Sequence, residues 1–171
     1  MINIEKLLTM KKRLLFTTVS LILLVGGCNS NTANSAGSMV ETKSVIKGAE
    51  PVPQSGGFSN IDNAKLQELL DQGVTLIDIR LEEEWQQTGI VKGSKTITFF
   101  DHMGRINPNF VPQFTSIADP EKPVMLICRT GNRTTAASQA IAQQLGYKKV
   151  LNVTHGIVGW ISEKRSIVSY K

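Results

Sequence analysis

Residues 124–133 read VMLICRTGNR, and this stretch decides the fold expected for the chain. Its first four residues are apolar, as is typical of a short strand buried on both faces of a parallel sheet. Polar residues 128–133 follow and lead directly into a helical pattern over residues 134–145. Active sites in α/β sheets gather at the carboxyl ends of the strands. Cys128, directly after the apolar run, is therefore the first candidate for a catalytic residue.

The loop after this strand is suited to holding an anion. Backbone N–H groups of residues 129–133, the positive end of the following helix and two arginines can all favour a thiolate. Gly131 adopts a positive φ without cost, and Asn132 tolerates the left-handed conformation. Such a setting lowers the pKa of a thiol, so we expect Cys128 to be nucleophilic at neutral pH. The alternative is a buried structural cysteine.

The segments around the loop alternate between strands and helices. Strand patterns cover residues 74–79, 95–99, 124–127 and 150–153, and helical patterns cover residues 61–70, 82–87, 134–145 and 157–163. This alternation predicts the α/β class, with a mostly parallel central sheet and helices on both faces.

Residues 1–27 have the pattern of an export signal. Lys11, Lys12 and Arg13 precede a mostly apolar run over residues 14–25. A transmembrane helix needs about 20 apolar residues, whereas the apolar part of a signal peptide needs roughly 7–15. Met10 is an alternative start of this signal peptide.

Residues 25–28, Val-Gly-Gly-Cys, resemble the lipobox of bacterial lipoproteins. We therefore expect Cys28 to be lipidated and to become the mature N-terminus, with an ordinary secretory signal as the alternative. The lipid would anchor the domain to a membrane of the bacterial cell envelope, facing the periplasm or the exterior. Asn29 favours the outer membrane if the host is Gram-negative.

The rest of the chain divides into two parts. Residues 28–57 hold the lipidated cysteine and a segment rich in Ser, Asn, Thr, Gly and Pro, which predicts a flexible linker. Residues 58–171 carry the periodic patterns and are expected to form the domain. The net charge of +5 lies largely in the leader, and aromatic residues make up 6% of the chain. These features argue against a nucleic-acid partner.

The loop over residues 128–133 resembles the active-site loop of rhodanese domains. Residues 76–93, which contain Asp78, Arg80 and the segment Glu83-Glu84-Trp85, resemble the family's N-terminal signature, and residues 156–160 resemble its C-terminal signature. The resemblance covers residues 58–168 and implies the rhodanese-like three-layer fold. Lys92 and His155 depart from the family, standing where proline and a small residue are common, which leaves the conformation of these turns open.

The resemblance implies a thiosulfate sulfurtransferase that needs no cofactor. Cys128 would attack the outer sulfur of thiosulfate or a similar anionic donor and pass the sulfur from a persulfide to a thiol or cyanide acceptor. A protein acceptor is also compatible with this chemistry. We expect Arg129 to attract the donor and Arg133 to close the loop, which Thr130, Gly131 and Asn132 complete. Asp78 and Arg80 are expected to tie the neighbouring strand end to the loop region.

Two other functions stay open. One is a non-catalytic module of the same fold that carries or binds sulfur. The other is an arsenate reductase or phosphatase, which the resemblance disfavours because those relatives use a loop one residue longer than the span from Cys128 to Arg133. Neither histidine, His102 or His155, has the spacing of a metal site, so we predict no metal. Trp85 and Trp160 are expected in the core.

Overall fold

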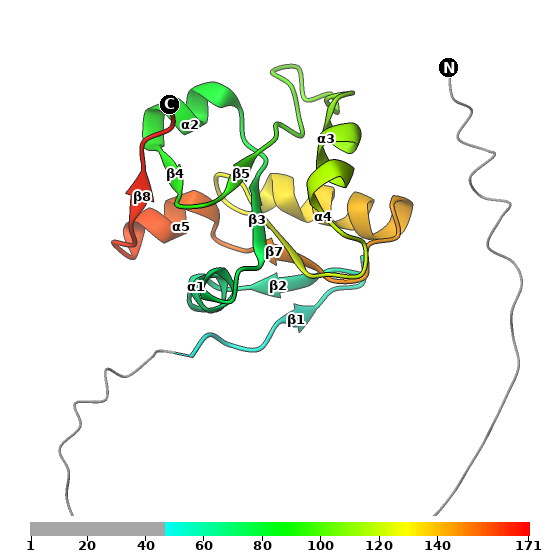
Figure 1. Cartoon of the computed structure of the whole chain (residues 1–171), viewed down its shortest axis with the longest axis horizontal. Helices are drawn as coiled ribbons and strands as arrows, with labels where there is room; N and C mark the ends of the chain where they lie inside the picture. The colour runs from blue at the N-terminus through cyan, green and yellow to red at the C-terminus, as the bar shows by residue number, and fades with distance from the viewer. Residues whose placement is uncertain (1–46) are drawn as a thin grey trace, which may run out of the picture. The chain divides into compact units, whose positions relative to one another are not determined.

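The computed structural model describes residues 47–171, so the predicted signal peptide, Cys28 and most of the predicted linker lie outside the described residues. A six-stranded sheet forms the centre of the domain (Figure 1). Its strands, in spatial order, are β1 (Val52–Pro53), β2 (Ser59–Ile61), β7 (Val150–Val153), β6 (Val124–Ile127), β3 (Thr75–Asp78) and β5 (Lys95–Thr96). Strand β1 is antiparallel to β2, and the other pairs are parallel. The predicted α/β class with a mostly parallel sheet is confirmed.

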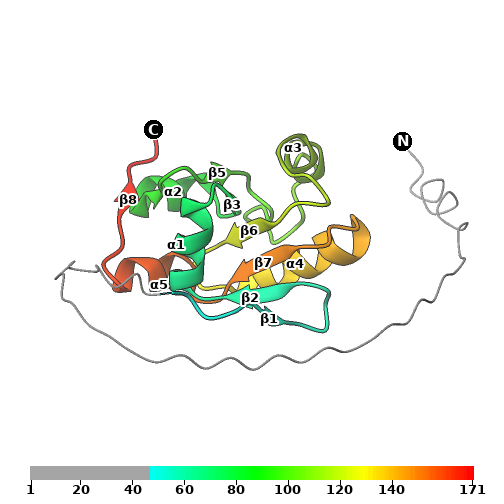
Figure 2. The ribbon, with the colours of Figure 1, turned by 60° about the horizontal axis from the view of Figure 1, so that its bottom comes forward.

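Five helices accompany the sheet: α1 (Asn63–Asp71), α2 (Glu82–Thr88), α3 (Phe110–Ile117), α4 (Asn132–Gln144) and α5 (Gly156–Ser162). Helices α3 and α4 contribute Phe110, Phe114 and Ile141 to one buried apolar cluster. Helices α1 and α5 contribute Leu66 and Trp160 to a second cluster. The two clusters lie on opposite faces of the sheet, which gives the three layers that Figure 2 shows from a second direction.

The central strands are buried on both faces, as their apolar runs predict. Leu126 of β6 joins the cluster under α3 and α4, while its neighbours Met125 and Ile127 join the cluster under α1 and α5. All four residues of β6 and all four of β7 are buried. This burial fixes the end of β6, and with it the position of Cys128, in the middle of the sheet.

Helix α3 is an element that the periodicity analysis did not predict. Its Pro112 lies in the first helical turn, where a missing N–H costs little. Phe110 and Phe114 are one turn apart and fully buried, and they stack at 5.3 Å between ring centroids. Packing of these two rings therefore stabilises a helix that the sequence pattern alone does not reveal.

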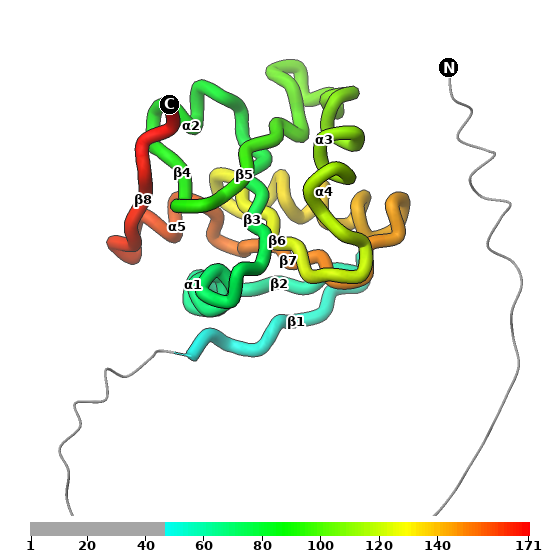
Figure 3. The backbone as a smooth tube through the Cα atoms, in the orientation of Figure 1, coloured from blue at the N-terminus to red at the C-terminus, as the bar shows by residue number. Residues whose placement is uncertain are grey.

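The C-terminal end of the chain packs against a segment from the middle of the sequence. Strand β8 (Ile167–Val168) pairs antiparallel with β4 (Ile90–Val91), and Figure 3 shows how the chain end runs beside this segment. Tyr170 packs on Trp85 with 5.2 Å between ring centroids. Trp85 and Trp160 are both buried, as predicted.

The folded part begins N-terminal to Phe58, the predicted start of the domain. Residues 52–53, assigned to the linker from composition, form the edge strand β1. The Ala49 N–H donates to Asp62 Oδ2 at 3.3 Å, and Gly48 packs against the backbone of Lys65. Ile61, placed in a helix by its apolar spacing, ends β2. In residues 47–171 the structure has no helix whose length and apolar character would let it cross a membrane.

Candidate active site

Cys128 directly follows β6 and is almost completely buried, with 1% of its surface exposed. Its sulfur accepts a hydrogen bond from the Gly131 N–H at 3.2 Å. The hydroxyl of Thr134, in the first turn of α4, lies 3.5 Å from the same sulfur. Cys128 is the free thiol of the described residues. Sequence reasoning did not include Thr134, although it stands directly after the predicted loop.

The loop's peptide groups are held by the start of α5. The Ile157 N–H donates to the Cys128 carbonyl at 2.8 Å, and the Val158 N–H donates to the Arg129 carbonyl at 3.1 Å. In a trans peptide the N–H points opposite to the carbonyl, so the N–H groups of Arg129 and Thr130 point away from α5. Within residues 47–171 neither N–H donates to a protein acceptor. These two donors and the first-turn N–H groups of α4 are the groups that the sequence analysis assigns to an anion cradle, and such groups favour a negative charge.

Two glycines allow this close approach of the loops. Gly131 has a φ of +95°, and a Cβ there would overlap the carbonyl oxygen of Thr154. Gly156 has a φ of +55°, and a Cβ there would lie 2.5 Å from the carbonyl oxygens of Cys128 and Arg129. Only glycine fits both the backbone angle and the space at these positions. Gly156 thus acts on the site, whereas the sequence marked it only as part of a C-terminal motif.

Arg133 forms a two-point ion pair with Glu84 of α2. Its Nη1 donates to Oε2 and its Nη2 to Oε1, each at 2.6 Å. Burial alone would raise the pKa of Glu84, but hydrogen bonds from Arg133 and from the Leu81 N–H lower it below the ordinary value. The pKa of Arg133 is raised by its hydrogen bonds to Glu84 and, to a smaller extent, by Cys128. Sequence reasoning placed Glu84 in a family motif but gave it no role.

Asp78 and Arg80 form a buried ion pair at the end of β3. Arg80 Nε lies 2.9 Å from Asp78 Oδ1, and Arg80 Nη2 lies 2.8 Å from Asp78 Oδ2. Arg80 also donates to the carbonyl of Glu84 at 3.1 Å and to Gly89 at 2.8 Å. The pair therefore fastens β3 to α2. Its link to the loop is indirect, because it runs through Glu84 to Arg133.

The remaining predicted loop residues lie at the surface. Arg129, Thr130 and Asn132 are exposed, and Asn132 is the first residue of α4. Among the described residues Arg129 forms no ion pair, so its charge is available at the mouth of the loop. The two arginines therefore differ in role, because the charge of Arg133 is neutralised by a carboxylate and that of Arg129 is not.

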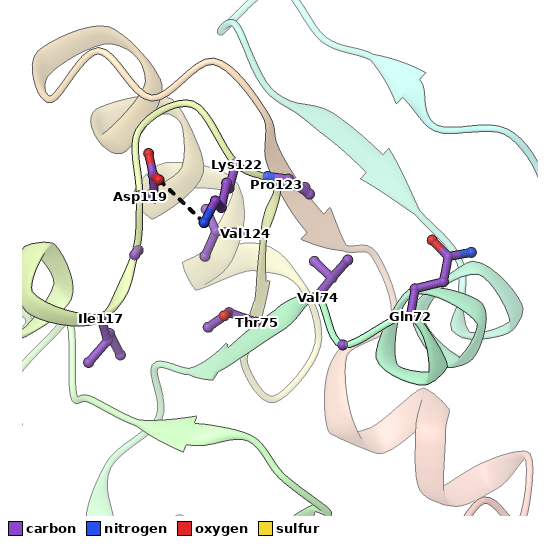
Figure 4. A pocket seen from close by; sticks show the side chains of 10 residues that line it. Gln72, Val74, Thr75, Ile117, Asp119, Lys122, Pro123 and Val124 are labelled. Atoms are coloured by element: carbon purple, nitrogen blue, oxygen red, sulfur yellow. Dashed lines mark ion pairs between the residues drawn. The ribbon is translucent and has the colours of Figure 1, made fainter.

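Two hollows differ in their relation to this loop. One, of about 400 Å³, is lined by Arg133, by Leu81 directly before α2, and by residues of the segment 100–104, including His102. His102 Nδ1 lies 3.3 Å from Glu83 Oε1. The other, of about 360 Å³, lies at the opposite edge of the sheet, at the amino ends of β3 and β6 (Figure 4). It is crossed by the ion pair of Asp119 and Lys122 and holds no cysteine or histidine.

The chemistry available at this site is that of a sulfur nucleophile beside backbone N–H donors. Among residues 47–171 there is no group of three or more His, Cys, Asp or Glu side chains that could hold a metal ion. A thiol in such a cradle can form a covalent intermediate while the N–H groups stabilise its negative charge.

Comparisons with known proteins show the family of this domain. The family model of the rhodanese-like domain matches residues 62–163. Rhodanese-like domain-containing protein 17 of Arabidopsis thaliana is 29% identical over 61% of this chain and 69% of its own length. Thiosulfate sulfurtransferase 18 of the same plant is 27% identical over 60% of this chain and 77% of its own. A solved rhodanese-related protein from Thermoplasma volcanium is 27% identical, with a TM-score of 0.51 over 65% of this chain and 98% of its own.

Proposed function

The chain belongs to the rhodanese-like domain family, and from this premise we propose that it is a sulfurtransferase that carries sulfane sulfur as a persulfide on Cys128. The observation that carries the proposal is the placement of the Cys128 sulfur. It lies at the end of a central strand and accepts the Gly131 N–H, beside the unpartnered N–H groups of Arg129 and Thr130. The similarity to a thiosulfate sulfurtransferase supports the same reaction class.

The first half-reaction loads the sulfur. The Cys128 thiolate attacks the outer sulfur of thiosulfate or a comparable sulfane donor, a new S–S bond forms, and the donor's own S–S bond breaks. Sulfite leaves with the electron pair of that bond. The persulfide now carries the negative charge on its terminal sulfur, where the free N–H groups of the loop can stabilise it.

The second half-reaction unloads the sulfur. An acceptor nucleophile, such as cyanide or a thiolate, attacks the terminal sulfur, and the persulfide bond breaks to return the Cys128 thiolate. A two-step cycle of this kind gives ping-pong kinetics. Because Cys128 is 1% exposed, a small or slender acceptor is favoured.

The test is the intact mass of the full chain carrying Cys28→Ser, in which Cys128 is the single thiol. After incubation with thiosulfate we expect a gain of about 32 Da, one sulfur atom, that disappears on addition of cyanide. Cys128→Ala should show no gain. If the chain loads no sulfur but turns over arsenate or a phosphomonoester in a reaction that depends on Cys128, the sulfurtransferase proposal is refuted. An arsenate reductase or phosphatase is then supported. Loading that no acceptor discharges would indicate a carrier module.

We also propose that Cys28 is lipidated and anchors the domain to a membrane of the cell envelope. The support is the lipobox-like segment at residues 25–28 and the apolar run before it. Cells fed a labelled fatty acid should incorporate the label into the chain and lose it in Cys28→Ser. Equal labelling of both forms would contradict the anchor, and it would leave the proposal for Cys128 unaffected.

A further inference from the structure

The carbonyl oxygen of Gly131 is the meeting point of three hydrogen-bond donors. The Thr135 N–H lies 3.0 Å away, the Thr135 hydroxyl 2.9 Å and the Thr134 hydroxyl 2.8 Å. A carbonyl oxygen has two lone pairs, so two donors satisfy it and the third is dispensable. The N–H of Thr135 belongs to the helix ladder and cannot turn away. One of the two hydroxyl groups can therefore leave the carbonyl without exposing an unsatisfied acceptor.

Thr134 is the hydroxyl with an alternative partner. Its oxygen lies 3.5 Å from the Cys128 sulfur, and a hydroxyl has one hydrogen to donate. While Cys128 is a thiol, its S–H can donate to Thr134, and the Thr134 hydrogen remains on Gly131. When the thiol proton is lost to a solvent base, the sulfur becomes an acceptor. The Thr134 hydrogen can then rotate toward it.

Asn152 of β7 orients the Thr135 hydroxyl toward the Gly131 carbonyl. Asn152 is buried, with 2% of its surface exposed, and its Nδ2 donates to the Thr135 hydroxyl oxygen at 3.2 Å and to Asn60 Oδ1 at 2.8 Å. A hydroxyl that accepts from Asn152 directs its own hydrogen to the other side, where Gly131 lies. The amide thus keeps the Gly131 carbonyl supplied by Thr135.

We propose that Thr135, oriented by Asn152, is a positioning residue that frees the Thr134 hydroxyl to stabilise the Cys128 thiolate. The proposal rests on the nucleophilic role proposed for Cys128. Without the Thr135 hydroxyl, Thr134 must choose between the Gly131 carbonyl and the sulfur. When Cys128 ionises, either the sulfur or the Gly131 carbonyl then lacks the hydrogen bond from the Thr134 hydroxyl. In the persulfide the inner sulfur is uncharged, and the Thr134 hydrogen returns to Gly131.

The surrounding charges are the same in every variant of the test, which removes them as an explanation. Charged and titratable residues on the loop and on the elements next to it are unchanged in each variant: Arg129, Arg133, Glu84, Asp78, Arg80 and His155.

The test is the pH profile of Cys128 alkylation by iodoacetamide in the full chain carrying Cys28→Ser. In Thr135→Val the midpoint of the profile should move to higher pH, and the rate at pH 6 should fall about fivefold, as expected for one hydrogen bond. Thr135→Ser, which keeps the hydroxyl, should restore the profile. Asn152→Ala should move the midpoint in the same direction by less.

Thr154→Val is the matched control. It removes a hydroxyl at the same sheet edge that donates to the Ile61 carbonyl at 3.2 Å and not to Gly131. An unchanged midpoint in Thr135→Val, or an equal change in Thr154→Val, would overturn the proposal. Alkylation needs no sulfur donor, so a chain that loads no sulfur but shows the expected profiles would refute the sulfurtransferase function and support the positioning role.

Discussion

Glu84 and Arg133, 49 residues apart in the sequence, join α2 to α4 through two hydrogen bonds of 2.6 Å. The carboxylate is itself held by the Leu81 N–H at 3.0 Å, and the Arg80 side chain holds the Glu84 carbonyl at 3.1 Å. The nucleophile loop is therefore tied to the neighbouring strand end by a chain of side chains from β3 through α2. Substitutions in this chain of contacts are therefore expected to change the stability of the domain, separately from the reactivity of the Cys128 sulfur.

Glu84→Gln should destabilise the domain. The neutral amide cannot accept both guanidinium hydrogen bonds, which leaves Arg133 partly unpaired in a half-buried place. Hydrogen bonds to charged groups contribute about 1.5–3 kcal/mol, and we expect a loss in this range from the free energy of unfolding in urea. Glu83→Gln is the matched control, because Glu83 faces the exposed His102 and should change stability little. Equal losses in both variants would contradict a specific role of Glu84.

The contribution of Glu84 should depend on pH. Its pKa is lowered in the folded state, so the unfolded state takes up the proton first as the pH falls. The stabilisation is complete above the ordinary glutamate pKa of about 4.3 and is lost as the pH falls through the lowered folded value. Urea titrations of the wild-type chain and Glu84→Gln should give a stability difference at pH 7 that shrinks under acid conditions. A difference that stays constant down to pH 3 would refute this linkage.

Gly156→Ala should abolish sulfur loading. The new Cβ would lie 2.5 Å from the carbonyl oxygens of Cys128 and Arg129, so the loop must move away from α5 and the N–H donors lose their direction. Gly146→Ala is the control, since Gly146 has a φ of +74° but no atom within 4 Å of the added Cβ. Backbone strain should cost both variants roughly 1–3 kcal/mol of stability, and the overlap with the two carbonyl oxygens should add to the loss in Gly156→Ala. Only Gly156→Ala should lose the mass gain with thiosulfate; loading in that variant would show that the contact between the loops is dispensable.

The parts of the fold that the sequence predicts are those with local signals. The apolar runs of β6 and β7 and the helical pattern before Gly146 suffice to place Cys128 at a strand end beside a helix start. The missed strands have only two residues each and depend on their partners: β1 pairs with β2 a few residues later, and β8 pairs with β4 across most of the domain. Glu84 carries no local sign either, because three consecutive glutamates begin α2 and only the tertiary structure shows which one meets Arg133.

Arg129→Ala should weaken capture of an anionic donor without weakening the fold. Arg129 is exposed and forms no ion pair within residues 47–171, whereas Arg133 is neutralised by Glu84. Arg129 thus directly follows the nucleophile in the sequence and carries a positive charge without a carboxylate partner among the described residues. Attraction by an exposed charge is screened by salt. We expect KM for thiosulfate to rise about tenfold at low salt, with kcat and urea stability nearly unchanged, and Arg129→Lys to recover most of the loss. Initial rates across ionic strengths measure this, and the gap between the wild-type and Arg129→Ala chains should narrow as salt increases. A fall in kcat alone would instead place Arg129 in the sulfur-transfer step.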